Sequence, residues 1–262
     1  MALPEMWMKK IWTRWNWTLW KNGARPLTLP KLALAAAALL AAAFGISACE
    51  NVASYTQPSL VRVIDASYIA PAIDVNVEGT LIAGNIGQGT ITPYATLPAS
   101  NDATIDITAA TGGVTLVDSQ GTLLAGHQHS VFLTDNGAAP KSYDVTVLED
   151  QQIAAASGHS DFRFLNQAPA TGPVDVYMIP SGSTMADTIP IVTALPVGGT
   201  AGYIAFTSQT VTMVITPTGV TTPKYTSTSI ALTGGEVRTV LIYDTQLTSN
   251  PPVEVTMVND VN

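Results

Sequence analysis

The chain has 262 residues, of which 47% are hydrophobic and 11% charged, and a net charge of −8. It contains a single cysteine, so no disulfide can form within it and its domains depend on core packing. An acidic chain has few groups that neutralise phosphates, which argues against a nucleic-acid partner.

The first segment in chain order has the pattern of an export signal. A leader with six basic residues precedes residues 32–48, LALAAAALLAAAFGISA, and Cys49 follows directly. A basic leader, an apolar run and a small-residue cleavage site together make the secretory pattern. The run of about 17 residues is at the short limit for crossing a bilayer about 30 Å thick. The alternatives are a retained transmembrane helix and a buried helix.

The end of this segment, ISAC (46–49), resembles a bacterial lipoprotein signal, in which a peptidase cuts before the cysteine and the thiol carries lipid. The resemblance implies a signal peptide over 1–48, lipidation of Cys49, a tether over 49–58 and an exported, membrane-anchored protein. Glu50 follows the cysteine, whereas the usual inner-membrane retention signal of such lipoproteins is Asp. The resemblance therefore favours the outer membrane, facing the periplasm or the cell surface.

Cleavage before Cys49 would change the charge of the protein. All five tryptophans lie before it, and five basic and eighteen acidic residues remain after it, a net charge of −13. Such a surface is repelled by anionic lipid head groups, so lipid rather than basic side chains must hold the protein to a membrane. The 214 residues from Cys49 onward are enough for two domains of about 100 residues.

The region after Cys49 has the pattern of β-strands. Residues 74–78, 104–108 and 142–147 alternate polar and apolar side chains. This alternation places one face of a strand in a core and the other in water, as in antiparallel sheets. Because short strands recur between glycine- and proline-rich turns, we predict an all-β fold. It comprises two tandem antiparallel β-sandwich domains, immunoglobulin-like in architecture, after an N-terminal signal helix.

The sequence also repeats itself. Residues 61–77 align without gaps to 162–178 at an offset of 101, and residues 126–135 align to 235–244 at an offset of 109. A repeat of this length indicates two copies of one domain. The predicted boundaries are 59–150 for the first domain, 151–159 for the linker and 160–262 for the second domain.

Two motifs carry a resemblance to a family. RVIDAS (62–67) and PAIDVNVEG (71–79) resemble the opening of a bacterial domain described as domain of unknown function 4397. The similarity is strongest over 60–80 and weaker over 161–180. The resemblance implies an exported protein, often with the domain in tandem, and a β-sandwich fold. It implies no activity.

The arginine and aspartate spacing is the most specific feature of the repeat. Arg62 and Asp74 are twelve residues apart, as are Arg163 and Asp175. If the strands that carry each pair are antiparallel neighbours, the opposite charges meet and stabilise the sheet by about 0.2–1 kcal/mol. We predict one structural ion pair in each domain, with a ligand-binding role as the alternative.

His127 and His129 are weak candidates for a metal site. Residues two apart share one face of a strand, so both imidazoles could reach one metal. Two ligands are too few for a firm site, and the second copy has Glu236 and Arg238 at the matching positions. We therefore predict no metal and no cofactor.

No other segment predicts catalysis. The run GHSD (158–161) places Ser, His and Asp side by side, whereas a working triad assembles residues distant in sequence. We predict a non-enzymatic envelope protein with a structural, adhesive or binding role, held to the membrane by lipid on Cys49. Its further partner would be an envelope protein or polysaccharide. The alternatives are an envelope hydrolase acting on polysaccharide and a calcium-stiffened surface spacer, with calcium near Glu149 and Asp150.

Overall fold

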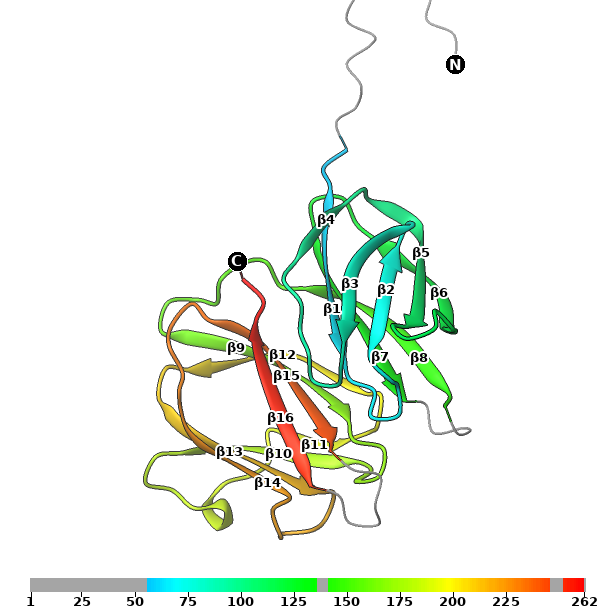
Figure 1. Cartoon of the computed structure of the whole chain (residues 1–262). Coiled ribbons are helices and arrows are strands. Elements are labelled where there is room, and N and C mark those ends of the chain that lie inside the picture. The colour runs from blue at the N-terminus through cyan, green and yellow to red at the C-terminus, as the bar shows by residue number, and fades with distance from the viewer. Residues whose placement is uncertain (1–55, 136–140, 246–251, 262) are drawn as a thin grey trace, which may run out of the picture. The chain divides into compact units, whose positions relative to one another are not determined.

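The structure is a computed structural model that describes residues 56–135, 141–245 and 252–261. The predicted signal peptide and Cys49 lie outside the described residues. Residues 56–262 form one compact unit. Its described part is all-β, as predicted, with sixteen strands and a single-turn 3-10 helix, η2 (Met185–Asp187), shown in Figure 1. In this part of the chain, no helix is long and apolar enough to cross a membrane.

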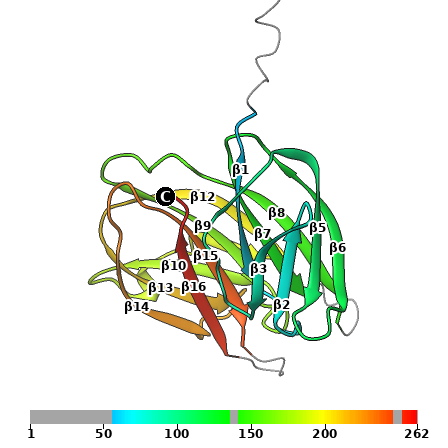
Figure 2. The ribbon, with the colours of Figure 1, turned by 45° about the horizontal axis from the view of Figure 1, so that its top comes forward.

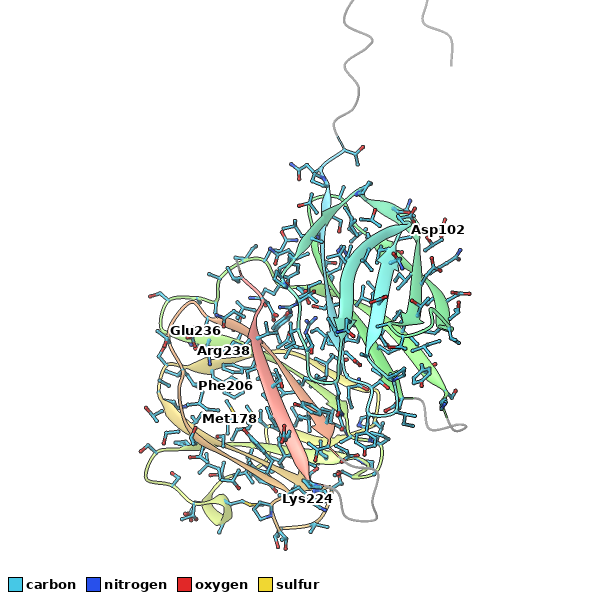
Figure 3. The ribbon with its side chains drawn as sticks, viewed as in Figure 1. Asp102, Met178, Phe206, Lys224, Glu236 and Arg238 are labelled. Atoms are coloured by element: carbon cyan, nitrogen blue, oxygen red, sulfur yellow. The ribbon has the colours of Figure 1, made fainter. Side chains whose placement is uncertain are left out.

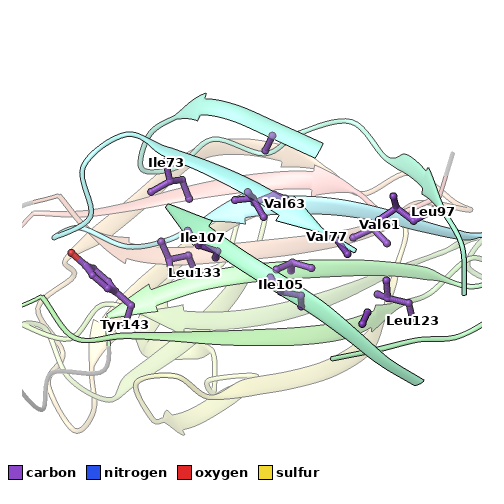
Figure 4. Packing of buried hydrophobic residues seen from close by; sticks show 14 residues of the cluster. Val61, Val63, Ile73, Val77, Leu97, Ile105, Ile107, Leu123, Leu133 and Tyr143 are labelled. Atoms are coloured by element: carbon purple, nitrogen blue, oxygen red, sulfur yellow. The ribbon is translucent and has the colours of Figure 1, made fainter. Parts of the chain in front are cut away.

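The first sandwich consists of two four-stranded sheets. Sheet A has the strand order β4-β1-β7-β8, and sheet B has the order β3-β2-β5-β6. Alternate residues of each strand enter the core between the sheets, including Val61 and Val63 of β1 and Ile105 and Ile107 of β5 (Figure 4). The strands are β1 (Ser59–Asp65), β2 (Ile73–Val77), β3 (Thr80–Ile86), β4 (Ala95–Leu97), β5 (Ser100–Ala109), β6 (Thr115–Leu123), β7 (Gln128–Asp135) and β8 (Tyr143–Asp150).

The second sandwich repeats this order strand for strand. Sheet C is β12-β9-β15-β16 and sheet D is β11-β10-β13-β14. Its core contains Phe162, Phe164, Met213 and Ile215. The strands are β9 (His159–Gln167), β10 (Val174–Pro180), β11 (Val192–Leu195), β12 (Thr200–Thr207), β13 (Thr210–Pro217), β14 (Tyr225–Ala231), β15 (Val237–Asp244) and β16 (Val253–Asn259).

One pairing in each sandwich departs from the predicted antiparallel pattern. β1 runs parallel to β7, and β9 runs parallel to β15, side by side in both views (Figures 1 and 2). The chain leaves sheet A after β1 and passes through sheet B before β7 returns beside β1. Long connections of this kind permit a parallel pair, which a tight hairpin cannot form.

The central strands of sheets A and C (β1, β7, β9 and β15) are buried on both faces along most of their length. Every residue of β7 is buried, and on β1 Arg62 and Ile64 are buried although they point away from the core of the first sandwich. A further apolar cluster joins residues from these outward faces of both sandwiches: Ile64, Ala66, Phe132, Leu165, Leu241 and Tyr243. The outer face of sheet A therefore packs on the outer face of sheet C.

Candidate functional site

The structure separates the arginine from the aspartate in each predicted ion pair. β1 belongs to sheet A and β2 to sheet B, and the corresponding strands β9 and β10 also lie in different sheets. Arg62 points outward from sheet A, whereas Asp74 alternates with core residues on β2 and lies on the outer face of sheet B. The predicted Arg62–Asp74 and Arg163–Asp175 ion pairs are wrong, because their strands are not neighbours.

The two aspartates instead hold the backbone of the adjacent strand. Asp74 accepts a hydrogen bond from the backbone N–H of Asn85 at 2.7 Å, and Asp175 accepts one from that of Ala194 at 2.8 Å. Asn85 and Ala194 have φ angles of 51° and 52°, a left-handed conformation that costs a non-glycine residue energy. Each aspartate therefore stabilises the same strained position in its own sandwich.

Arg62 spans from the first sandwich to the second. Its Nε donates to Ser130 Oγ at 2.7 Å within sheet A. Its Nη1 donates to the backbone carbonyl of Asn259 at 3.1 Å, and its Nη2 forms an ion pair with Asp260 in the second sandwich. The side chain is 1% exposed. Two of the three hydrogen bonds of this guanidinium thus cross to the second sandwich.

Arg163 makes the same contacts in the opposite direction. Its Nε donates to Thr239 Oγ1 at 3.1 Å within sheet C. Its Nη1 donates to the carbonyl of Glu149 at 3.0 Å, and its Nη2 forms an ion pair with Asp150 in the first sandwich. Asp150 also lies 3.5 Å from Nη2 of Arg62, so the two arginines share it.

A tyrosine completes each half of this arrangement. The Tyr94 ring lies 4.8 Å from the Arg62 guanidinium carbon, and its hydroxyl donates to Asp150 at 2.7 Å. The Tyr203 ring lies 5.0 Å from that of Arg163, and its hydroxyl donates to Asp260 at 2.8 Å. Cation–π contacts of this kind are stronger when water is excluded. We name the whole set the arginine clamp: Arg62, Tyr94, Ser130, Asp150, Arg163, Tyr203, Thr239 and Asp260.

Burial and neighbouring charges shift the pKa of four clamp residues, Tyr94, Tyr203, Arg62 and Asp260. Burial, reinforced by the nearby carboxylates, raises the pKa of both Tyr94 and Tyr203, so their hydroxyls remain donors. Burial alone would lower the pKa of Arg62, but Asp150 and Asp260 raise it. Burial also raises the pKa of Asp260, against the opposing effect of the guanidiniums. Because its charged groups are paired inside the protein, the clamp acts as a structural junction.

The two histidines do not converge on one site. His127 Nδ1 lies 2.6 Å from Glu149 Oε1, and both side chains are about half exposed. His129 is buried; its Nε2 accepts the backbone N–H of Leu124 at 3.3 Å and its Nδ1 lies 3.0 Å from Ser59 Oγ. Burial lowers the pKa of His129, which keeps the ring neutral. The described residues contain no group of three metal-ligating side chains.

The second copy uses the matching positions differently. Arg238 donates to Glu236 at 2.6 Å in place of the histidines, and the two residues lie side by side in Figure 3.

Glu149 and Asp150, the candidate calcium ligands, both have other side-chain partners in the structure. Asp150 accepts hydrogen bonds from Arg163, Tyr94 and Ser130 and lies 3.5 Å from Nη2 of Arg62. The Glu149 carboxylate is paired with His127.

Sequence reasoning identified the two arginines but missed the other members of the clamp. The repeat carried the missing signal, because each missed residue of the first sandwich has a counterpart 109 or 110 positions later. Extending the alignment with an offset of 109 would have matched Tyr94 with Tyr203 and Ser130 with Thr239, and a one-residue insertion would have matched Asp150 with Asp260.

A hollow of about 410 Å³ lies on the outer face of sheet D, beside the loop that contains η2. Seven of its fourteen lining residues carry hydroxyl groups, and none of the fourteen is charged. The loop from β10 to β11 that walls it is far longer than the two-residue turn between β2 and β3. The register aligns Thr210, Thr212 and Val214 of this face with Asp102, Thr104 and Asp106 of sheet B (Asp102 in Figure 3).

The comparison with protein families agrees with the motifs. Residues 59–177 match the model of the family Domain of unknown function (DUF4397). The DUF4397 match covers the first sandwich, the linker and the strands β9 and β10, which confirms the predicted resemblance. No curated protein matches the chain.

Three solved structures are similar over 78% of the chain. One is the family 26 carbohydrate-binding module CBMbc from Eubacterium rectale Amy13K in complex with maltoheptaose, at 12% identity, 98% coverage of that chain and a TM-score of 0.25. The second is the Bacillus anthracis TIE protein, at 10% identity, 44% coverage and a TM-score of 0.24. The third is a candidate cell adhesion protein from Bacteroides eggerthii, at 11% identity, 96% coverage and a TM-score of 0.23.

A buried carboxyl distinguishes the two copies at the end of β1. Asp65 Oδ1 accepts the backbone N–H of Ser67 at 3.0 Å, but Oδ2 makes no hydrogen bond within the described residues. The second copy has Asn166 here, whose amide donates to the carbonyls of Gly172 and Leu195 at 2.9 Å. Burial raises the pKa of Asp65 to about 7. A protonated Asp65 would supply a donor where Asn166 has one.

The first prediction concerns the clamp. Asp150→Asn should lower the free energy of unfolding by about 3–5 kcal/mol, because it removes one of the two carboxylates that pair with buried guanidiniums. Urea denaturation of residues 50–262 measures the change. The matched control is Glu149→Gln, which alters a half-exposed pair with His127 and should cost less than about 1 kcal/mol. Equally small losses for both variants would contradict the structural role of the clamp.

The second prediction concerns Asp65. Its folded-state pKa is raised to about 7 from 3.8, so its contribution to stability is full below pH 4 and is lost as the pH rises through 7. Asp65→Asn should therefore flatten the pH dependence between 4 and 7 and raise stability at pH 8 by about 2–4 kcal/mol. Thermal and urea unfolding across this range measure both effects. The mirror variant Asn166→Asp should be destabilised at pH 8; a gain there would contradict the assignment.

Proposed function

We propose that the chain is an exported lipoprotein whose two sandwiches form a rigid, non-catalytic binding module at the cell envelope. The observation that carries this proposal is the arginine clamp. It commits two of the five basic residues after Cys49 to joining the sandwiches. Burying charged groups is favourable only with nearly complete pairing, so the clamp holds one relative position of the sandwiches. Rigid placement of exposed surfaces suits a module that binds or spaces other envelope components.

The hollow on sheet D is the surface on which we place the ligand. Its volume lies at the small end of the range for small-molecule sites, about 300–1,000 Å³. Its uncharged lining favours a neutral, hydroxyl-bearing ligand, since charged ligands would find no counter-charge there. An envelope polysaccharide presents such groups. Loops that extend from a rigid scaffold often carry binding sites, as the long β10–β11 loop would here.

The hydrolase alternative requires two carboxylates or a metal in one accessible hollow. A second hollow includes Glu236, whose carboxylate is paired with Arg238. A third, beside Arg62 and Tyr94, contains no carboxylate among its lining residues. The observed chemistry thus favours binding over hydrolysis in the three hollows described.

The third prediction tests the lipid anchor. In a bacterial host supplied with an alkyne-tagged fatty acid, the full chain should incorporate the tag and sediment with membranes. Cys49→Ala should lose both the tag and the sedimentation, because lipid is the proposed attachment. Asn51→Ala, two residues further on, is the matched control and should behave as the wild type. Membrane retention of Cys49→Ala would show that the N-terminal segment is a retained anchor.

The fourth prediction tests the hollow. Residues 50–262 should bind purified envelope polysaccharide, and Thr212→Trp should weaken that binding at least tenfold because the indole fills the hollow. The matched control is Thr104→Trp, which adds the same side chain at the corresponding exposed position of sheet B. Isothermal titration calorimetry measures both. Equal binding by the two variants would place the ligand elsewhere, and no binding by the wild type would reject polysaccharide as the ligand.

A further inference from the structure

The two halves of the arginine clamp are copies of one another. Arg62 binds the carboxylate of Asp260, and Arg163 binds that of Asp150, each across the junction. Each arginine also binds the backbone carbonyl of the residue that precedes its aspartate. An interface in which residue i contacts j and the equivalent of j contacts the equivalent of i has the reciprocity of a two-fold symmetric dimer.

The apolar part of the junction follows the same rule. Ile64 and Leu165 occupy equivalent positions at an offset of 101, and Phe132 and Leu241 do so at an offset of 109. All four are at most 1% exposed and belong to one cluster. If the sandwiches separated, these side chains and the clamp arginines would be exposed on both faces. Such a surface strongly favours a partner that covers it again.

Only one segment of chain connects the two faces. β8 ends at Asp150 and β9 begins at His159, so residues 151–158 form the sole crossing between the sandwiches. This linker is held at both ends: Gln151 donates to Tyr203 and Asp161, and the carbonyl of Gly158 accepts the backbone N–H of Ser208. Between them Ala155 is buried, while Ile153 is 80% exposed. A single crossing lets one chain release a sandwich and accept the matching sandwich of another chain without threading.

We propose that the clamp face also joins two copies of this chain, by exchange of sandwiches. The first sandwich of one chain then packs on the second sandwich of the other, and all clamp contacts are kept twice in the dimer. The free energies of the exchanged dimer and the closed monomer therefore differ only through the linker contacts and the entropy lost on association. A short flexible linker gives each sandwich an effective concentration of about 1 mM near the other sandwich of its own chain. The monomer therefore dominates when the protein concentration is below about 1 mM, and the dimer dominates above that concentration. On a membrane, exchange would link two anchored chains, a consequence that rests on the proposed function.

Shortening the linker tests the proposal. A 50–262 variant that lacks residues 151–156 keeps two linker residues, which reach about 11 Å. The deletion also removes Gln151 and with it the contacts to Tyr203 and Asp161 that hold the linker in the closed form. We expect this variant to favour exchange, and light scattering should show twice the monomer mass. The matched control replaces residues 151–156 by six Gly and Ser residues and should remain a monomer.

A folded monomer of the shortened variant would overturn the proposal. In a dimer prepared from labelled and unlabelled chains, isotope-filtered NMR should detect contacts between Ile64 or Phe132 of one chain and Leu165 or Leu241 of the other; a dimer without them would overturn it as well. A second measurement tests the proposal even if the shortened variant does not fold. Wild-type residues 50–262 refolded at about 1 mM should give a dimer that persists on dilution, whereas refolding at 1 µM should give monomer only. Monomer alone at both concentrations would overturn the proposal.

Discussion

The described structure depends on two buried carboxylates, Asp150 and Asp260. Each accepts an arginine from the opposite sandwich, together with a tyrosine and a hydroxyl from its own. Removing charges from water is costly, and the attraction inside the protein offsets that cost only when the remaining hydrogen bonds are also made. The clamp meets this condition in both directions at once. A displacement of one sandwich would break both halves together.

Duplication explains how such a junction can arise. The two copies share the arginines, tyrosines and aspartates of the clamp, while several outward positions of sheets B and D differ. Sheet B has Asp102 and Asp106 where sheet D has Thr210 and Val214. The uncharged hollow and the long loop beside it occur on the second copy. The face formed by sheets A and C therefore keeps the residues that join the two sandwiches. The opposite face, formed by sheets B and D, can change and acquire a binding surface.

The sequence was sufficient for the fold class and for the repeat, and the reason is local. Alternation such as that of 74–78 reports which face of a strand is buried, and the 101-residue offset reports a second copy. The ion-pair partner of Arg62 could not be predicted from the sequence, because spacing along the chain places two charges together only if their strands are neighbours in one sheet. The apolar runs VFL (131–133) in β7 and VLI (240–242) in β15 indicated strands buried on both faces, a signal more specific than alternation. Read with the 109-residue offset, they would have pointed to the junction.

The central claim is that the clamp makes the two sandwiches one rigid body. Backbone residual dipolar couplings of residues 50–262 in a weakly aligning medium test it most directly. Couplings from the two sandwiches should fit a single alignment tensor with the same magnitude and orientation, using their relative placement in the structure. Two tensors of different magnitude, one for each sandwich, would show independent motion across the linker and would contradict the account.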